Sequence, residues 1–149
     1  MKRTRLTAVG LLVLGVVVAP TCVQAAGLSA RAVVEKRIAA VMRHDLEAIV
    51  ALYAPDAVET SPGFCAGRHG PEGARKTYGD LFQAYPNITD DDVAYVVDGN
   101  QVAVQFVARV RKPDGSFLFE IPIANFLTVE HGRITRDVTY FDTKGRPCT

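Results

Sequence analysis

The sequence predicts an α+β fold in which a curved, mainly antiparallel sheet wraps round three N-terminal helices. Two observations support this prediction. Apolar residues follow the helical period in the first part of the chain, and they follow the strand period of two from about residue 92 onward. A run of helices followed by a run of strands is typical of α+β domains.

The predicted helices begin at recognisable capping residues. Ser29 can cap the first helix, whose apolar stripe carries Arg37 at one edge. Asp45 can cap the second helix, in which apolar residues recur at i, i+3, i+4 and i+7 as far as Tyr53. The third helix begins near Pro71, which suits a first helical turn, and ends at the next proline.

The predicted strands form a meander. A short strand within "APDAVETSP" lies between the second and third helices. The segment "TDDD" has no calcium-loop spacing and is interpreted as a solvated turn. The turn signals "DG", "KPDGS" and "HG" then separate four strands, which makes consecutive strands antiparallel. These strands are expected over residues 92–97, 101–111, 117–130 and 133–142.

The long strand over 117–130 is apolar on both faces, which indicates burial on both faces. In a one-layer sheet of this kind, the second cover would be another subunit. We therefore expect a homodimer formed through the outer face of the sheet.

The first residues have the pattern of a secretory signal. A positive segment with Lys2, Arg3 and Arg5 precedes a short apolar run and small residues that suit cleavage after Ala25, or after its neighbour Ala26. The apolar run is too short for a membrane span. We therefore expect a secreted or periplasmic protein that has no membrane attachment after cleavage.

Removal of residues 1–25 leaves one domain over 26–149. It takes away three of the 17 Lys and Arg residues and no acid, so 14 basic residues face 16 acidic ones and the net charge is −2. This balance provides no basic surface for nucleic acid. A chain of about 120 residues can bury a single core.

Cysteines and histidines give few further signals. Cys65 in a Gly/Pro-rich loop and Cys148 near the end could form a disulfide in an exported protein, or both could remain free thiols. His44, His69 and His131 have no metal-binding spacing, so we expect no metal site.

Several stretches resemble a known superfamily. "VVEKRIAAVMRHDLEAIVALYAPDA", "GRHGPEGARKTYGDLF", "IPIANF" and "GRITRDVTYFD" are similar to segments of nuclear transport factor 2-like proteins, and within them of the SnoaL-like and ketosteroid-isomerase-like group. The resemblance implies a cone-shaped α+β barrel with one deep apolar pocket, commonly dimerised through the sheet. It also implies that any catalysis needs no cofactor.

The residues that carry catalysis in this group are absent here. The resemblance matches the isomerase base to Ser61, its oxyanion-binding tyrosine to Arg37 and its protonated aspartate to Ala124. It matches the last-strand acid of the cyclases and epoxide hydrolases to Thr139. Enolisation needs a base and donors aimed at the developing charge, so we expect no steroid isomerase activity.

Asp137 lies two residues before Thr139 and therefore shares its face of the strand. With Arg37 it could act as an acid/base carboxylate beside a cationic anchor. The alternative is a buried ion pair without a substrate, because two buried charges would pair with each other. The expected pocket lining comprises Arg37, Tyr53, Ser61, Tyr78, Phe82, Phe106, Glu120, Ala124, Phe126, Thr139 and Phe141.

Three hypotheses of function follow. The first is an exported protein that binds a small apolar or aromatic molecule in the cone. The second is a cofactor-free lyase, isomerase or cyclase that uses Asp137 as acid/base and Arg37 as anchor. The third is a structural dimer with a filled cone. A closed Arg37–Asp137 pair favours binding, whereas an unpaired Asp137 in a large pocket favours the enzyme.

Overall fold

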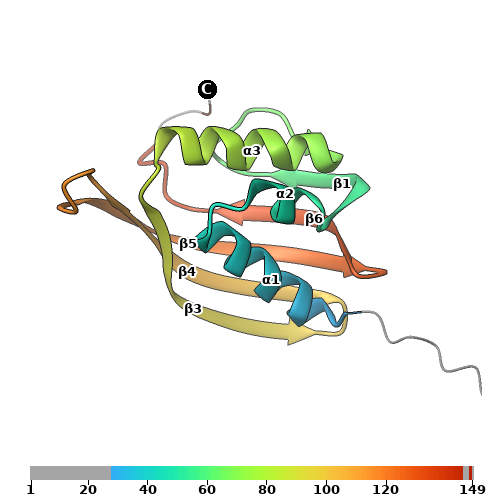
Figure 1. Ribbon diagram of the computed structural model, residues 1–149. Coiled ribbons are helices and arrows are strands. Elements are labelled where there is room, and N and C mark those ends of the chain that lie inside the picture. The colour runs from blue at the N-terminus through green and yellow to red at the C-terminus, as the bar shows by residue number, and fades with distance from the viewer. Residues whose placement is uncertain (1–27, 146–147, 149) are drawn as a thin grey trace, which may run out of the picture.

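The computed structural model describes residues 28–145 and 148, and its helices and strands follow the predicted order (Figure 1). The predicted signal segment and its cleavage site lie outside the described residues. No helix of the described part is long and apolar enough to span a membrane. The elements are α1 (Ala30–Met42), α2 (Leu46–Val50), β1 (Tyr53–Thr60), β2 (Arg68–His69), α3 (Gly70–Ala84), β3 (Ile88–Asp98), β4 (Gln101–Arg111), β5 (Phe117–Glu130) and β6 (Arg133–Tyr140).

The strands form one six-stranded sheet in the order β2-β1-β6-β5-β4-β3. All neighbouring pairs are antiparallel except β1 and β6, which run parallel. The α+β class and the mainly antiparallel curved sheet are therefore confirmed. The sheet is open, with β2 and β3 at its two edges, so the strands do not close into the expected barrel.

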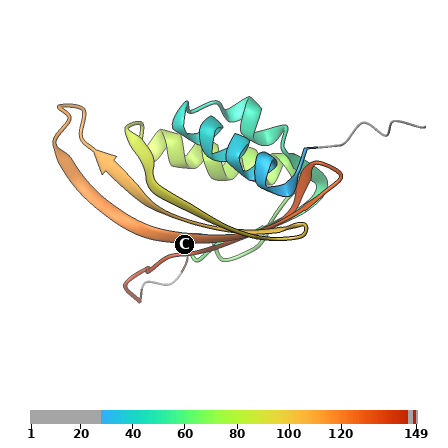
Figure 2. The ribbon, with the colours of Figure 1, turned by 90° about the horizontal axis from the view of Figure 1, so that it is seen from below.

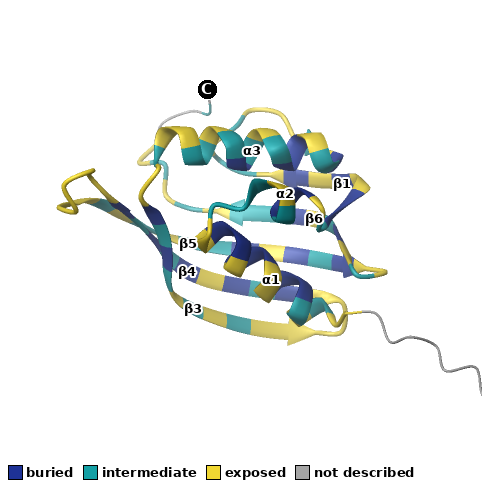
Figure 3. Cartoon of the chain, in the orientation of Figure 1, coloured by how far each residue is buried: buried dark blue, intermediate teal, exposed yellow. Residues whose placement is uncertain are grey.

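The helices lie on one face of the sheet, and the sheet curves toward them (Figure 2). Buried and more exposed residues alternate along several strands (Figure 3), and the buried ones form one core cluster with residues of the helices. The core there combines the buried stripe of α1 with inward residues of β4 and β5, among them Val34, Ile38, Val104 and Leu127. None of the helices in the described part of the chain lies over the opposite sheet face (Figure 2).

Local chemistry accounts for the helix boundaries. The side chains of Ser29 and Asp45 accept hydrogen bonds from the backbone N–H groups of Ala32 and Ala48 and so cap α1 and α2 as predicted. Gly70 starts α3 with a φ of +59°, and a Cβ there would lie 2.6 Å from the carbonyl oxygen of Pro55. Only glycine combines a readily adopted positive φ with the absence of a Cβ, and it lets α3 lie close to β1.

The second helix and the third strand differ from the prediction. Helix α2 ends at Val50, and Tyr53 begins β1, because Ile134 N–H bonds to Leu52 O at 2.8 Å and draws this segment into the sheet. Strand β3 begins at Ile88, so "TDDD" lies in a strand that pairs with β4 and contains a register shift between residues 91 and 94. The two-residue strand β2 was not predicted.

Candidate functional site

The centre of the candidate site is an ion pair between α1 and β6. Arg37 follows Val33 by four residues and Val34 by three, so the helical period places it in the buried stripe of α1. Asp137 faces the same side of the sheet as its buried register partner Leu127. The Asp137 Oδ2 atom lies 3.4 Å from Arg37 Nη2, and their side chains are 1% and 5% exposed.

Two buried tyrosines extend this pair. Tyr53 donates its hydroxyl to Asp137 Oδ2 at 2.7 Å. Arg37 Nε donates to Tyr78 Oη at 2.7 Å and to Tyr53 Oη at 3.3 Å. Burial is the largest cause that raises the pKa of both phenols. Both therefore keep their protons at neutral pH, and these two predicted lining residues act as polar partners of the ion pair.

Asn125 binds the other oxygen of Asp137. Its Nδ2 donates to Asp137 Oδ1 at 3.0 Å and to Thr139 Oγ1 at 2.5 Å. Asp137 thus accepts from Asn125 and Tyr53 and lies against Arg37. Both of its carboxylate oxygens therefore already accept a hydrogen bond within the protein.

Two polar atoms of this network have no hydrogen-bond partner in the described part of the chain. They are Arg37 Nη1, a donor, and Asn125 Oδ1, an acceptor, and both are buried. A buried polar group without a partner costs about 1–3 kcal/mol, and a charged group costs more. Groups of this kind commonly mark the place of an ordered water or a ligand.

Glu59 is a second buried carboxylate beside the pair. It is 4% exposed, and its register partner on β6 is Asp137. Thr77 on α3 donates to Glu59 Oε2 at 2.8 Å, and Arg68 Nη1 donates to Thr77 Oγ1 at 3.0 Å. Burial, and then the charge of Asp137, raises the pKa of Glu59 from 4.5 to about 7. Glu59 was not predicted as a site residue, although the strand period of two places residues 59 and 61 on one face.

Asp90 is a third buried acid on the helix side of the sheet. It is 8% exposed, and its backbone N–H donates to Met42 Sδ of α1 at 3.1 Å. Burial raises the pKa of Asp90 to about 6, and the charge of Arg37 opposes this rise. The "TDDD" segment therefore places an acid near the Arg37 site.

Three other predicted lining residues lie in different surroundings. Phe106 is 7% exposed and belongs to the core. Phe82 is partly buried and stacks on His44 with ring centroids 4.4 Å apart. Ser61 Oγ accepts the Gly63 N–H at 3.1 Å, so this hydroxyl closes a turn after β1.

Three further predicted lining residues face away from the helices. Phe126 is 52% exposed, and Glu120 accepts a hydrogen bond from Arg109 on the outer face at 3.1 Å. Ala124 borders a hollow of that face, and its neighbour Asn125 is the residue that points inward. The resemblance-based match is thus one residue out of register, and a shift of one residue moves a strand side chain to the opposite face.

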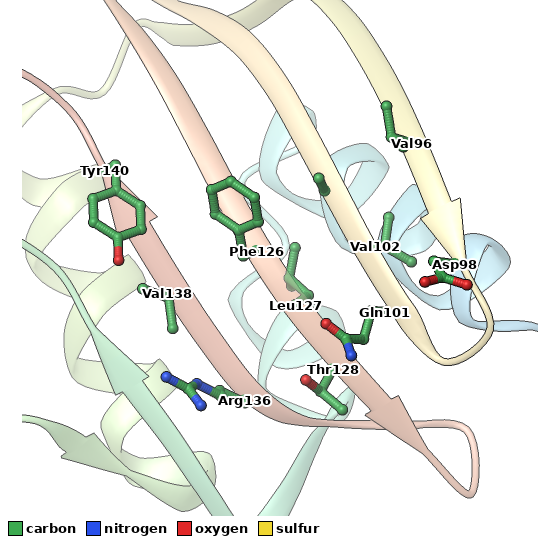
Figure 4. Close-up of a pocket in the computed structure, with 11 residues that line it drawn as sticks. Val96, Asp98, Gln101, Val102, Phe126, Leu127, Thr128, Arg136, Val138 and Tyr140 are labelled. Carbon is green, nitrogen blue, oxygen red and sulfur yellow. The ribbon is translucent and has the colours of Figure 1, made fainter.

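The outer sheet face carries two hollows of about 520 and 510 Å³. In the larger one, Phe126 and Tyr140 come from neighbouring strands (Figure 4), and their rings meet edge-on with centroids 5.9 Å apart. Phe141, a predicted lining residue of the cone, borders the second hollow. Neither hollow is lined by Arg37 or Asp137.

Cys65 and Cys148 form a disulfide whose Cα atoms are 5.0 Å apart. It ties the end of the chain to the loop that follows β1. Among residues 28–145 and 148, no group of three or more His, Cys, Asp or Glu side chains is placed to hold a metal ion.

Comparisons with known proteins agree with this architecture. The model of the SnoaL-like domain family matches residues 34–137. An NTF2-like protein of unknown function from Burkholderia pseudomallei is 20% identical, with a TM-score of 0.65 over 77% of this chain and 92% of that chain. A putative polyketide cyclase from Pseudomonas putida is 19% identical, with a TM-score of 0.67 over 79% of this chain and 95% of that chain.

A third similar structure is TerC, co-crystallised with polyporic acid. It is 18% identical, with a TM-score of 0.66 over 77% of this chain and 92% of that chain. No match was found among curated proteins. The family match covers more than half of the sequence, so the chain belongs to the SnoaL-like domain family, and its fold is that of NTF2-like proteins.

Proposed function

We propose that this chain is an exported SnoaL-like domain protein that binds a small apolar or aromatic molecule between the helices and the sheet. The observation that carries the proposal is the pair of buried atoms without partners, Arg37 Nη1 and Asn125 Oδ1. A molecule that offers an oxygen acceptor to Arg37 and a hydroxyl donor to Asn125 would satisfy both atoms.

The rest of such a molecule would meet apolar side chains. Partly buried residues surround the core on the helix side, including Phe82, Tyr85, Phe119 and Ile123. Tyr85 and Phe119 pack edge-on with centroids 5.4 Å apart. Small-molecule sites typically combine an apolar lining with a few polar groups that orient the ligand. The co-crystal of TerC with polyporic acid supports small-molecule binding on this fold.

Catalysis by Asp137 is less well supported. The fold is shared with putative polyketide cyclases. However, a general acid or base must reach the proton that it transfers. Asp137 is 1% exposed and already accepts from Tyr53 and Asn125. Its geometry suits a residue that holds Arg37 in place, which favours binding over a lyase, isomerase or cyclase.

Export and homodimerisation are part of the proposal. The Cys65–Cys148 disulfide supports export, because such bonds persist in oxidising compartments. The outer sheet face supports a dimer, because Val96, Phe126 and Tyr140 are 73%, 52% and 58% exposed there. Apolar side chains gathered on an uncovered sheet face are typical of an interaction surface.

A pair of matched phenylalanine variants tests the position of the binding site. Phe82 lies on the helix side, whereas Phe117 at the start of β5 is 55% exposed. Binding of the fluorescent probe 1-anilinonaphthalene-8-sulfonate should weaken at least several-fold in Phe82→Ala and stay unchanged in Phe117→Ala. Equal binding by the wild type and both variants would contradict a site in the cone. Absence of probe binding by the wild type would favour the remaining candidate, a structural dimer with a filled cone.

A further inference from the structure

Two carboxylates lie side by side on the parallel strands β1 and β6. Glu59 and Asp137 are register partners, and they are 4% and 1% exposed. Both face the helices: Glu59 contacts Thr77 of α3, and Asp137 contacts Arg37 of α1. Two acids so close together in a buried site cannot both ionise without a compensating charge.

The surroundings of the two acids are unequal. Asp137 accepts from Tyr53 and Asn125 and forms the ion pair with Arg37. Glu59 has one donor in the described part of the chain, the Thr77 hydroxyl. The positive charge of Arg37 therefore lies beside Asp137. Glu59 is the member of the two carboxylates that more easily holds a proton.

The groups that face Glu59 can be counted from each neighbouring element. Asp137 comes from β6, Arg37 from α1 and Arg68 from β2, while Tyr53 and Tyr78 from β1 and α3 remain neutral. Arg68 also bonds outward to the exposed Asp80, 3.3 Å away.

Arg37 and Asp137 cancel each other's charge, so ionised Glu59 would leave the buried cluster with one negative charge in excess. This imbalance agrees with the rise of the Glu59 pKa to about 7, for which burial is the first cause and Asp137 the second.

We propose that the site takes a small apolar monoanion at the free Nη1 of Arg37, and that Glu59 takes up one proton when this anion binds. The proposal rests on the proposed function and specifies its ligand class as an organic carboxylate, enolate, phenolate or sulfonate. A bound anion adds a negative charge to the buried cluster. Protonation of Glu59 removes the negative charge that Glu59 itself contributes. Binding of the anion and binding of the proton therefore favour each other.

The sign of the pH dependence follows from this coupling. At pH values below the pKa of Glu59 in the protein without a bound anion, Glu59 is already protonated. The affinity for the anion is then insensitive to this group. At pH values above this pKa, Glu59 must take one proton from the solvent for each anion that binds. The affinity therefore falls by about tenfold per pH unit until Glu59 ionises in the complex as well. Asp90, the other buried acid near Arg37, has a pKa raised to about 6 and changes charge mainly at lower pH.

The test uses two probes with the same aromatic skeleton. 1-Anilinonaphthalene-8-sulfonate keeps its negative charge throughout the pH range, whereas N-phenyl-1-naphthylamine lacks the sulfonate. Each probe is titrated into the protein from pH 6 to pH 9. We expect the affinity for the sulfonate to fall by about tenfold per unit above pH 7 and the affinity for the neutral probe to stay constant.

Glu59→Gln removes the titrating proton and keeps an acceptor for Thr77. The variant should bind the sulfonate with a flat pH profile and more tightly than the wild type at pH 9. Asp56→Asn, a change of an exposed acid on the same strand, should keep the wild-type slope. Calorimetry of the wild type in buffers of different ionisation enthalpy should show proton uptake approaching one per sulfonate above pH 7, and this result does not depend on the folding of any variant.

The outcomes separate this inference from the proposed function. Binding of both probes without a pH slope, or a slope that persists in Glu59→Gln, would overturn the proton coupling and leave small-molecule binding standing. Failure of both probes to bind at every pH would overturn both proposals.

Discussion

Replacement of Glu59 by glutamine should stabilise the protein at alkaline pH. The folded state holds the Glu59 proton more tightly than the unfolded chain does, because the pKa rises from 4.5 to about 7. Between these values the folded state binds more protons, so the stability that Glu59 contributes falls as the pH rises, and it stays low above pH 7. At about 1.4 kcal/mol per pH unit, the full loss is roughly 3 kcal/mol. Glutamine resembles the protonated acid and avoids this loss.

Urea unfolding of the wild type and Glu59→Gln, followed by circular dichroism, measures the difference. We expect the variant to be more stable by roughly 3 kcal/mol at pH 8 and by less than about 1 kcal/mol at pH 5. Asp90 has a raised pKa in both proteins, so its contribution cancels in the comparison. The exposed Asp56→Asn control should change stability by at most about 0.5 kcal/mol. Equal unfolding free energies of the wild type and Glu59→Gln at pH 8 would contradict a raised pKa of Glu59 in the folded protein.

Three further predictions concern the ion pair, the disulfide and the outer sheet face. Arg37→Met should cost about 3–5 kcal/mol in urea unfolding, because Asp137 becomes an uncompensated buried charge; Arg37→Met combined with Asp137→Leu should cost less than the sum of the single changes. Cys65→Ser with Cys148→Ser opens a loop with a sequence separation of 83 residues and should cost up to about 4.5 kcal/mol, measured in the same way. Phe126→Glu places a charge on the exposed outer face and should convert dimers into monomers in light scattering, whereas an unchanged dimer would place the interface elsewhere.

Much of the fold could be predicted because local patterns determine it. Ser29 and Asp45 cap their helices, and alternation along β4 places Val102 and Val104 in the core, where the structure has them. Tyr53 was placed in a helix because the helical spacing of apolar residues continues to it. A backbone hydrogen bond from the distant Ile134 decides otherwise, and no local pattern records that contact.

The candidate site was harder to predict, because it depends on register and on contacts between distant segments. The helical period placed Arg37 at the edge of the apolar stripe, and the strand period placed Asp137 on the face of Thr139. This was enough to give a buried ion pair as one of two alternatives, beside an acid/base role of Asp137. The assignment of Ala124 instead of Asn125 came from a match by resemblance, in which a shift of one residue reverses the face. Glu59 could have been found from the strand period alone. The rise of its pKa, however, depends partly on the charge of Asp137, which lies on another strand.

We propose that the Arg37–Asp137 site binds a small molecule rather than transforming one. Native mass spectrometry of the mature protein, purified from a periplasm together with its Asp137→Asn variant, tests this claim most directly when it is followed by extraction and identification of bound molecules. We expect a small apolar or aromatic molecule on the wild-type protein that the variant, if folded, also retains. A molecule that is held only by Asp137→Asn would contradict it, because the wild type would then be converting and releasing its ligand.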